Sequence, residues 1–547
     1  MNKTQKIIYP LLLAFVGAVG IFIGSKIQQN ITKSDLQNLR FFQSDKLSVI
    51  TNMIEKDYVD TINKEELIEK VIPIVLDQLD PHTTYITAEE MRGVSEEMRG
   101  NFSGIGVQFI MQNDSVTVVD VVSGGPSQKL GIMAGDRIAK VNGADVSGVG
   151  LKSDSIVSLL KGRKGTVVNV GIHRPGFTNL LDFKIERDEI PLVSVDVSYM
   201  IDNEIGLIKV NRFAETTHGE FLQGIKDLAS AGAKKLIVDL RGNSGGYLQA
   251  VFEMVDEFLP ANKMIVYTEG KARPRNNYLS TENGIWENGD LIVLIDEYSA
   301  SASEIFAGAI QDNDRGLIVG RRSYGKGLVQ EQIPFMDGSA VRLTVARFYT
   351  PSGRSIQKPY GDGNEEYRMD LYNRMIHNEM TQEDSIHFKD TLKYYTTGGR
   401  LVHGGGGIMP DFFVPADTTG VNEFYTSIVS KNLIYYYAFD YADQNRNALK
   451  SMKTAKEIEN YLNQKNVFDL FLNHIKKSGI KYSAEDLAES RKLIESQLLA
   501  YIARNTIGDA GFYPIIYKID PTVKKAIDLL QKNWNSKEIA AIENKKN

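Results

Sequence analysis

The chain has 547 residues, of which 42% are apolar and 24% charged; this balance predicts several globular domains and excludes a disordered or collagen-like chain. Acidic side chains outnumber basic ones by 69 to 63, so the formal net charge is −6 and no nucleic-acid partner is expected. Cysteine is absent, which excludes cysteine proteases, thiolate zinc sites, iron–sulfur clusters and disulfide frameworks.

The N-terminus has the pattern of an export signal. Lys3 and Lys6 precede an uncharged, mostly apolar stretch over residues 7–24, and Lys26 follows it. As a helix this stretch reaches about 27 Å, which barely spans a hydrocarbon core. Because no small-x-small cleavage site follows, we favour a retained signal anchor within residues 1–30 over a cleaved signal peptide. The rest of the chain is expected to be exported, to the periplasm or cell envelope, and anchored to the inner membrane.

Two regions with different residue patterns follow. Residues 31–92 carry apolar side chains at helical spacing and are predicted to form an N-terminal helical region, with Pro73 as a kink or boundary. Short β-branched runs cut by glycines then predict a β-rich module over residues 93–187. Its expected strands lie at 116–122, within 130–141, and at 167–172 and 180–185.

Strands and helices alternate over residues 188–418, which predicts a parallel or mixed sheet with crossover helices. A polar stretch at 360–395 is predicted to be an insertion or surface excursion. Residues 419–547 are predicted to form a C-terminal helical region. The expected strands of the middle region are 205–210, 235–240, 291–298 and 317–320, and its expected helices include 247–259 and 303–311.

One local pattern points to a serine hydrolase. Gly242 to Gly246 matches the G-x-S-x-G nucleophile elbow and lies between a predicted strand and a predicted helix. An elbow enzyme, however, has its glycine-rich oxyanion loop before the serine, whereas here His403 and the glycines after it follow. A trypsin-like order needs a histidine upstream, and His82, His173 and His218 have no recognisable catalytic neighbourhood. Ser244 therefore stays an alternative nucleophile.

A second pattern falls short of a phosphate-binding loop. Residues 320–327 follow a predicted strand and end in Gly-Lys-Gly. A P-loop needs Ser or Thr after the lysine to hold Mg²⁺, and this chain has Gly327 there. An NTPase is therefore disfavoured.

A third pattern combines a serine and a lysine. Ser301 and Glu304 fit a capping box, which places Ser301 at a helix N-terminus, where free amides and the helix dipole stabilise an oxyanion. Lys326 follows Ser301 by 25 residues. A strand–helix–strand crossover of that length brings both residues to the carboxyl ends of neighbouring strands, where active sites of open α/β sheets gather.

Several motifs in a fixed order resemble the carboxy-terminal processing peptidases, the tail-specific protease family. The likeness runs from about residue 31 to about residue 418. It implies a multidomain mixed α/β protease core with an inserted PDZ module, a helical N-terminal region and a helical C-terminal region. The motifs are Leu79-Asp-Pro-His82-Thr-Thr-Tyr85, Asp239-Leu-Arg-Gly-Asn-Ser-Gly-Gly246, Ser301-Ala-Ser-Glu304, Tyr324-Gly-Lys326-Gly-Leu-Val-Gln330, Pro351-Ser-Gly-Arg354 and Gly404 to Asp411.

The resemblance assigns the catalytic roles. It implies Ser301 as nucleophile, Lys326 as general base and Gln330 as the residue that orients the lysine amine. The backbone N–H groups of Gly246 and Ala302 would form the oxyanion hole. The base must be neutral, so the lysine pKa must fall from about 10.4 toward 7–8, which burial in an apolar pocket can supply. No cofactor and no metal are implied, and His82 would be structural.

The β-rich module resembles a PDZ domain. Its candidate carboxylate loop is Gly104-Ile105-Gly106-Val107, whose amides would bind the C-terminal carboxylate of a substrate that adds as an extra strand. The Gly131 to Asp136 segment strengthens this likeness. Many family members have an arginine where this chain has Lys161, so the regulatory contact of that arginine is not expected here.

The leading interpretation is an exported serine endopeptidase that binds polypeptides with free, apolar C-termini and cleaves upstream of them. Two alternatives are a PDZ scaffold with an inactive protease-like core, and a Ser–His–Asp hydrolase that uses Ser244. Self-association or an adaptor is left open, as are the substrate identities and the role of the helical tail.

Overall fold

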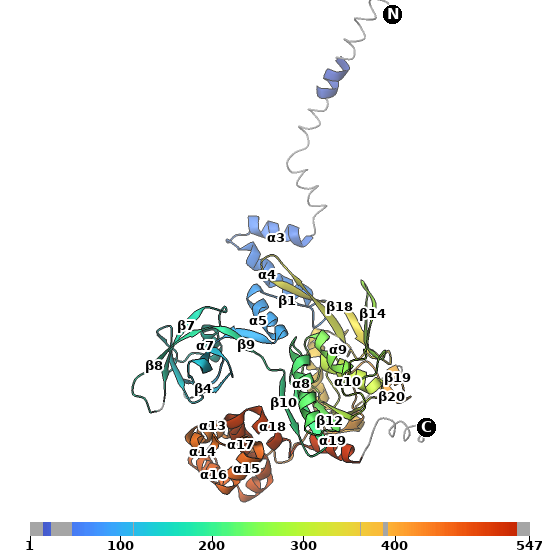
Figure 1. Cartoon of the computed structure of the whole chain (residues 1–547). Coiled ribbons are helices and arrows are strands. Elements are labelled where there is room, and N and C mark those ends of the chain that lie inside the picture. Colours follow the sequence, from blue (N-terminus) through green and yellow to red (C-terminus); the bar gives the residue numbers. More distant parts are fainter. Residues whose placement is uncertain are drawn as a thin grey trace, which may run out of the picture. The chain divides into compact units, whose positions relative to one another are not determined.

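The computed structural model describes residues 15–22, 46–112, 114–174, 176–361, 363–386 and 392–532, and Figure 1 labels its elements. The chain divides into two compact units, Met1–Asp80 and Pro81–Asn547. In the first, the helices are α3 (Lys46–Asp57) and α4 (Lys64–Leu76), and residues 15–22 are also helical. Most of the apolar stretch 7–24 lies outside the described residues. Among those described, no helix is long and apolar enough to cross a membrane.

The predicted helical region 31–92 is described only from residue 46, and within 46–92 the prediction was wrong at a short strand. Helix α4 runs through Pro73 to Leu76, but residues Thr84–Ile86 form strand β1, which pairs antiparallel with β18 (Ala340–Tyr349) of the second unit. Helix α5 (Ala88–Arg99) follows, started by a Thr87–Glu90 capping box. The local helical spacing could not indicate β1, because a three-residue strand is stabilised by a partner strand far along the chain.

A β module, residues 101–191, lies along the chain between α5 and the first strand of the central sheet, β10 (Val195–Met200). Its first and last strands, β2 (Asn101–Gly104) and β9 (Asp188–Pro191), pair antiparallel, so the chain enters and leaves the module side by side. Val116, Val118 and Ile138 are among its fully buried core residues. The expected strands are confirmed. The remaining elements are β3 (Val107–Gln112), β4 (Ser115–Val121), α6 (Pro126–Lys129), β5 (Arg137–Val141), β6 (Ala144–Asp145), α7 (Ser153–Leu160), β7 (Val167–His173) and β8 (Leu181–Glu186).

A six-stranded sheet forms the centre of the second unit, in the order β10-β11-β12-β15-β16-β21. Strand β10 is antiparallel to β11, and the other neighbours are parallel, so the predicted mixed sheet is confirmed. Its strands are almost continuously apolar because both faces are covered. They are β10 (Val195–Met200), β11 (Ile205–Val210), β12 (Lys235–Asp239), β15 (Asp290–Ile295), β16 (Leu317–Gly320) and β21 (Phe412–Phe413).

Helices cover each face of this sheet. One face packs against α8 (Thr217–Ser230), α9 (Leu248–Asp256) and α10 (Ala302–Asp312), shown in green in Figure 1. The other face packs against α19 (Pro521–Gln531), near the C-terminal end of the chain. The last described helix is therefore part of the layered core, although it lies in the segment that was predicted to be a separate helical region.

An antiparallel sheet stands beside the central one. Its order is β1-β18-β13-β14, with β17 paired to β18, and it includes β13 (Met264–Gly270), β14 (Arg273–Leu279) and β17 (Leu328–Pro334). Among the described residues β17 pairs only with β18, so one of its edges carries no strand. A small two-stranded sheet of β19 (Lys393–Tyr395) and β20 (Leu401–His403) lies apart from it.

The polar stretch predicted as an insertion or surface excursion contains a helix, α11 (Asn364–Ile376), that buries two of its side chains. In this helix, Tyr367 and Arg374 are each only 3% exposed. Arg374 donates to the backbone carbonyls of Arg322 and Ser323. The other side chains of α11 are exposed or half-buried, as the prediction of a surface segment expects, and composition could not indicate these two buried residues because their partners are found only in the folded chain. A short 3₁₀ helix, Glu383–Ser385, follows α11.

The helices after β21 form a bundle with a core of its own, drawn in orange in Figure 1. Phe424, Phe471 and Leu498 are among the buried residues of this core. The bundle confirms the predicted helical character of this part of the chain. Its helices are α12 (Glu423–Ser430), α13 (Leu433–Gln444), α14 (Arg446–Leu449), α15 (Ala455–Gln464), α16 (Val467–Lys477), α17 (Ala484–Ile507) and α18 (Asp509–Ile516).

Candidate active site

Ser301 lies at a sharp turn between strand β15 and helix α10. Its backbone has φ 54° and ψ −110°, in the left-handed half of the map that side-chain-bearing residues rarely adopt. Strain of this kind concentrates at functional sites, and a serine on a strained strand-to-helix turn is the geometry of a nucleophile elbow. The sequence pattern of an elbow lies at Ser244, but the elbow conformation is found at Ser301.

The carboxylate of Glu304 connects the turn at Ser301 to the loop that carries Lys326. This side chain is fully buried. Its Oε2 accepts hydrogen bonds from the N–H of Ser301 at 2.9 Å and of Lys326 at 2.8 Å. Its Oε1 accepts from the N–H of Gly325 at 2.7 Å and from Ser323 Oγ at 2.5 Å. Burial raises the pKa of Glu304, while these hydrogen bonds oppose the rise.

This arrangement also explains why residues 320–327 are not a phosphate loop. The amides of Gly325 and Lys326 are those that would cradle an anion, and they already donate to the Glu304 carboxylate. A bound phosphate would have to displace the Glu304 oxygens from the same amides. The sequence argument against an NTPase therefore has a structural counterpart.

A second turn, residues 242–246, is bound to the Ser301 turn through backbone and side-chain hydrogen bonds. The carbonyl of Asn243 accepts from the N–H of Ala300 at 3.1 Å and from Ser303 Oγ at 2.8 Å. Asp296, after β15, accepts from the N–H of Gly242 at 2.9 Å. These contacts bring the glycines after Ser244 to the Ser301 turn, as the resemblance implies for Gly246.

The two glycines of that turn leave no room for a side chain. A Cβ on Gly246 would lie 2.0 Å from the carbonyl oxygen of Phe213, and one on Gly245 would lie 2.8 Å from Ser301 Cβ and 3.0 Å from the Ala302 nitrogen. The Phe213 carbonyl accepts from the N–H of Tyr247 at 2.8 Å. Within the described chain, no hydrogen bond is found to the N–H of Gly246 or Ala302. Both are thus available as donors beside Ser301.

A cavity of about 340 Å³ brings the expected catalytic residues together. Ser301, Lys326, Gln330 and the backbone of Gly246 all line it. Ser244 lines it as well, but none of its lining residues is a histidine. The cavity therefore places a lysine, rather than a histidine, beside both candidate serines. Tyr247, Leu248, Leu328 and Met98 of α5 supply apolar surface.

The wall of this cavity that carries Gln330 is strand β17. A register shift between Val329 and Gln330 interrupts its ladder with β18. Bulges of this kind re-aim side chains near active sites. The Gln330 amide nitrogen donates to the backbone carbonyl of His82, in the loop before β1.

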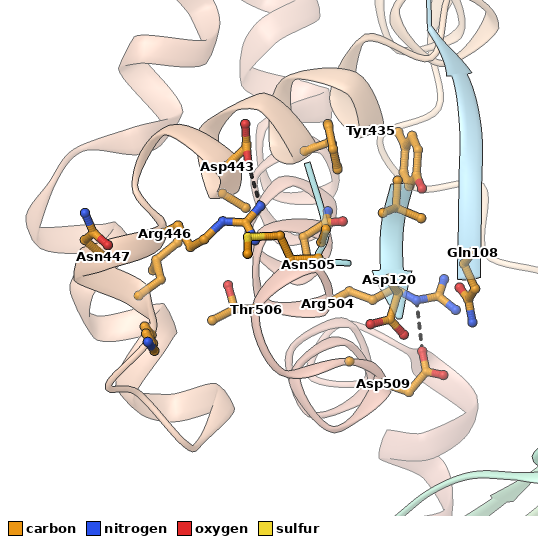
Figure 2. Close-up of a pocket in the computed structure, with 18 of the residues that line it drawn as sticks. Gln108, Asp120, Tyr435, Asp443, Arg446, Asn447, Arg504, Asn505, Thr506 and Asp509 are labelled. Atoms are coloured by element: carbon orange, nitrogen blue, oxygen red, sulfur yellow. Dashed lines mark hydrogen bonds and ion pairs between the residues drawn. The ribbon is translucent and has the colours of Figure 1, made fainter. Parts of the chain in front are cut away.

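A larger cavity, of about 680 Å³, lies between the β module and the helical bundle (Figure 2). Its lining contains no serine and no histidine among the described residues. Figure 2 shows two ion pairs in it: Arg446 pairs with Asp443 at 2.6 Å and Arg504 with Asp509 at 2.9 Å. From the described part of the chain, this larger cavity therefore offers neither a serine nor a histidine for hydrolysis.

A buried ion-pair network supports the start of the 242–246 turn. Asp239 is fully buried; burial acts against its charge, but the neighbouring Arg241 and Lys209 hold its pKa well below the ordinary range. Arg241 Nη2 lies 2.6 Å from Asp239 Oδ2, and Tyr517 donates its hydroxyl to the same oxygen at 2.7 Å. Arg241 also reaches Asp520, the cap of α19. Residues at the C-terminal end of the chain thus stabilise the loop that carries Gly246.

The expected carboxylate loop joins strands β2 and β3 of the β module. The carbonyl of Ile105 accepts from Ser127 and that of Gly106 from the N–H of Val122. Gly106 has φ 73°, and a Cβ there would lie 3.0 Å from Ile190. Lys161 is engaged elsewhere, because its Nζ lies 3.2 Å from Glu96 of α5.

Comparison with known proteins shows which family this chain belongs to. The chain is 36% identical over 348 residues to a carboxy-terminal-processing protease of Bartonella bacilliformis, a match that covers 62% of this chain and 78% of that protein. It is 32% identical over 359 residues to the carboxy-terminal processing protease CtpA of Bacillus subtilis, covering 65% and 76%. The chain belongs to peptidase family S41. The family model matches residues 204–363, and a PDZ model matches residues 103–185.

Membership of the S41 family makes the chain a serine peptidase of the carboxy-terminal processing group. The β module is its PDZ domain. Residues 424–508, most of the helical bundle, match a family of unknown function. Among solved structures, the photosystem II D1 C-terminal processing protease is 28% identical and covers 58% of this chain and 85% of that chain, with a TM-score of 0.35.

Sequence reasoning missed several residues of this site. Glu304 was recognised only as a helix cap, because its i,i+3 spacing reveals the Ser301 contact but not the contacts to Gly325 and Lys326. Met98 and Leu248 gave no signal. Tyr367 lies in a segment that composition placed at the surface.

Proposed function

We propose that this S41 peptidase hydrolyses peptide bonds with a Ser301–Lys326 dyad. The observation that carries the proposal is the strained Ser301 turn, tied through Glu304 to the Lys326 loop at one cavity. Ser301 Oγ attacks the scissile carbonyl carbon, and its proton passes to the neutral Nζ of Lys326. The Gly246 and Ala302 N–H groups bind the oxyanion. Lys326 then protonates the leaving amine, and a water molecule hydrolyses the acyl-enzyme.

Gln330 completes the proposed base. Its amide nitrogen is engaged by His82, so its Oε1 is the end of the side chain available to accept a hydrogen bond from Lys326. An acceptor at this position orients the amine toward Ser301. The open edge of β17 offers backbone groups along which an extended substrate can add as a strand.

The dyad is tested with purified variants and an unfolded protein substrate. Ser301→Ala and Lys326→Ala should each abolish hydrolysis, whereas Ser244→Ala should retain substantial activity because only the backbone of its turn is used. Circular dichroism checks that all variants are folded. Loss of activity in Ser244→Ala together with activity in Ser301→Ala would overturn the proposal. An inactive wild-type chain would favour the alternative of a PDZ scaffold.

We further propose that the PDZ domain captures substrates by a free, apolar C-terminus at Gly104 to Val107. The loop joins two strands, its Ile105 and Gly106 carbonyls are already used, and its N–H groups suit a carboxylate. Replacing the terminal carboxylate of a model substrate by an amide should slow cleavage markedly, chiefly by raising KM. Equal cleavage rates for the substrates with a terminal carboxylate and a terminal amide would show that the PDZ domain does not capture substrates by this group.

The apolar stretch 7–24 supports a location of the enzyme at the inner membrane. We propose that this apolar stretch, preceded by Lys3 and Lys6, directs export and then anchors the enzyme to the inner membrane, with the substrates in the cell envelope. N-terminal sequencing of the mature protein from membrane and soluble fractions tests the anchor. A soluble form that begins near residue 25 to 31 would contradict it.

A further inference from the structure

Gln330 depends on a loop that is distant in sequence. Its amide nitrogen donates to the His82 carbonyl, and the same loop is attached to β18, where Thr83 Oγ1 accepts from the N–H of Thr344 at 3.1 Å. Thr344 is the residue opposite Gln330 in the ladder of β17 and β18. The position of the amide is therefore set by the position of residues 82 and 83.

The side chain of His82 is in turn bound by Tyr367 of α11. His82 Nε2 lies 2.8 Å from the Tyr367 hydroxyl, and the two rings pack edge to face with centroids 5.2 Å apart. Tyr367 is 3% exposed. Burial raises the pKa of Tyr367, so its hydroxyl keeps its proton at neutral pH.

The same hydroxyl also contacts Gln357, which binds the main chain just after Lys326. Gln357 Nε2 lies 3.4 Å from the Tyr367 hydroxyl, and Gln357 Oε1 accepts from the N–H of Gly327 at 2.8 Å. Gly327 follows Lys326 directly. Tyr367 thus contacts both the residue that holds Gln330 and the residue that holds the main chain after the lysine.

Helix α11 lies just beyond the stretch that the S41 family model matches. The family match ends at residue 363, and α11 begins at Asn364. The helix is attached to Lys358, in the segment just before it. Lys358 Nζ donates to Asp370 of α11 at 2.8 Å and lies 4.1 Å from the centre of the Tyr367 ring. Helix α11 is therefore held beside the residues that flank Lys326.

We propose that Tyr367 is a positioning residue for the dyad: its hydroxyl fixes His82, and through it the Gln330 amide that orients Lys326. The inference rests on the proposed dyad. It gives α11 a role in catalysis without any contact with substrate. Tyr367 does not line the cavity at Ser301, so its loss should alter the chemical step rather than binding.

The test uses Tyr367→Phe in the full-length enzyme. This change keeps the ring that packs on His82 and Lys358 and removes only the hydroxyl. We expect kcat to fall about tenfold, with KM changed less than about twofold, because one buried hydrogen-bond partner is lost. Tyr372→Phe is the matched control, since Tyr372 is 51% exposed on the same helix. It should behave as wild type.

A double-mutant cycle separates positioning from general damage to the fold. If Tyr367 acts through Gln330, then adding Tyr367→Phe to Gln330→Ala should lower kcat by less than about threefold further. When hydrolysis by Gln330→Ala is too slow to follow, the rate at which a fluorophosphonate probe labels Ser301 replaces kcat in the same cycle. An undiminished loss in the Gln330→Ala background, or an unchanged kcat in Tyr367→Phe alone, would overturn the inference. Activity in Ser301→Ala would instead overturn the dyad itself.

Discussion

The backbone N–H groups of Ser301 and Lys326 donate to the same oxygen, Oε2 of Glu304, at 2.9 and 2.8 Å. Two segments separated by 25 residues are therefore held against one buried carboxylate. A nucleophile and a base must keep their separation within a fraction of an ångström, and a shared acceptor gives that precision without contacting either reacting atom.

Glu304→Gln should lower kcat at least about tenfold and destabilise the fold by about 1–3 kcal/mol, because an amide offers one acceptor oxygen and turns an NH₂ group toward existing donors. Hydrolysis rates and urea unfolding measure the two effects. Glu485→Gln is a matched control, since Glu485 is an exposed acid in the first turn of α17. A fully active Glu304→Gln enzyme would contradict the role of the shared carboxylate.

Lys326→Arg should be inactive although it keeps the positive charge. A guanidinium stays protonated at any pH at which the protein is folded, so it cannot accept the serine proton. Fluorophosphonate labelling of Ser301 should slow in parallel with hydrolysis. Labelling at the wild-type rate in this variant would show that another group is the base.

Gly245→Ala and Ser244→Ala form an adjacent pair with opposite expected results. Gly245 has φ 103°, and its Cβ would meet Ser301 Cβ at 2.8 Å, so alanine must displace the nucleophile turn. Activity should fall more than about tenfold. Ser244 is exposed, and its alanine variant should remain active. Comparable activities in the two variants would argue against the close contact.

His218 should make stability depend on pH. Its hydrogen bond to Glu257, 2.7 Å long, raises the pKa of His218 above 6.5. A raised pKa in the folded state contributes stability below the unfolded pKa, and this contribution is lost as the pH rises through the folded value. The Tm deficit of His218→Gln relative to wild type should therefore be larger near pH 6 than near pH 8.5. Thermal melts across this range measure it, and a deficit that grows with pH would contradict the assignment.

The sequence alone carried the family resemblance and four of the six strands of the central sheet, while the choice of Ser301 over Ser244 came from that resemblance and stays a prediction. These features are local or linear: apolar strands β11 and β16, a capping pattern at Ser301 and Glu304, and a fixed spacing to Lys326 can be read directly along the chain. The glycine turn at 242–246 was also recognised from its residues, and its contact with Ser301 is the one that its motif implies.

The tertiary structure decided what no local pattern encodes. The strain at Ser301 exists because hydrogen bonds from the 242–246 turn and from Glu304 over-determine its backbone. Strand β1 exists because β18 pairs with it, and Arg374 and Tyr367 of α11 are buried because they find partners in the Arg322–Ser323 turn and at His82. Each of these contacts joins residues far apart in sequence. Their energies come from burial and from satisfying polar groups in the folded state, which composition and periodicity do not report.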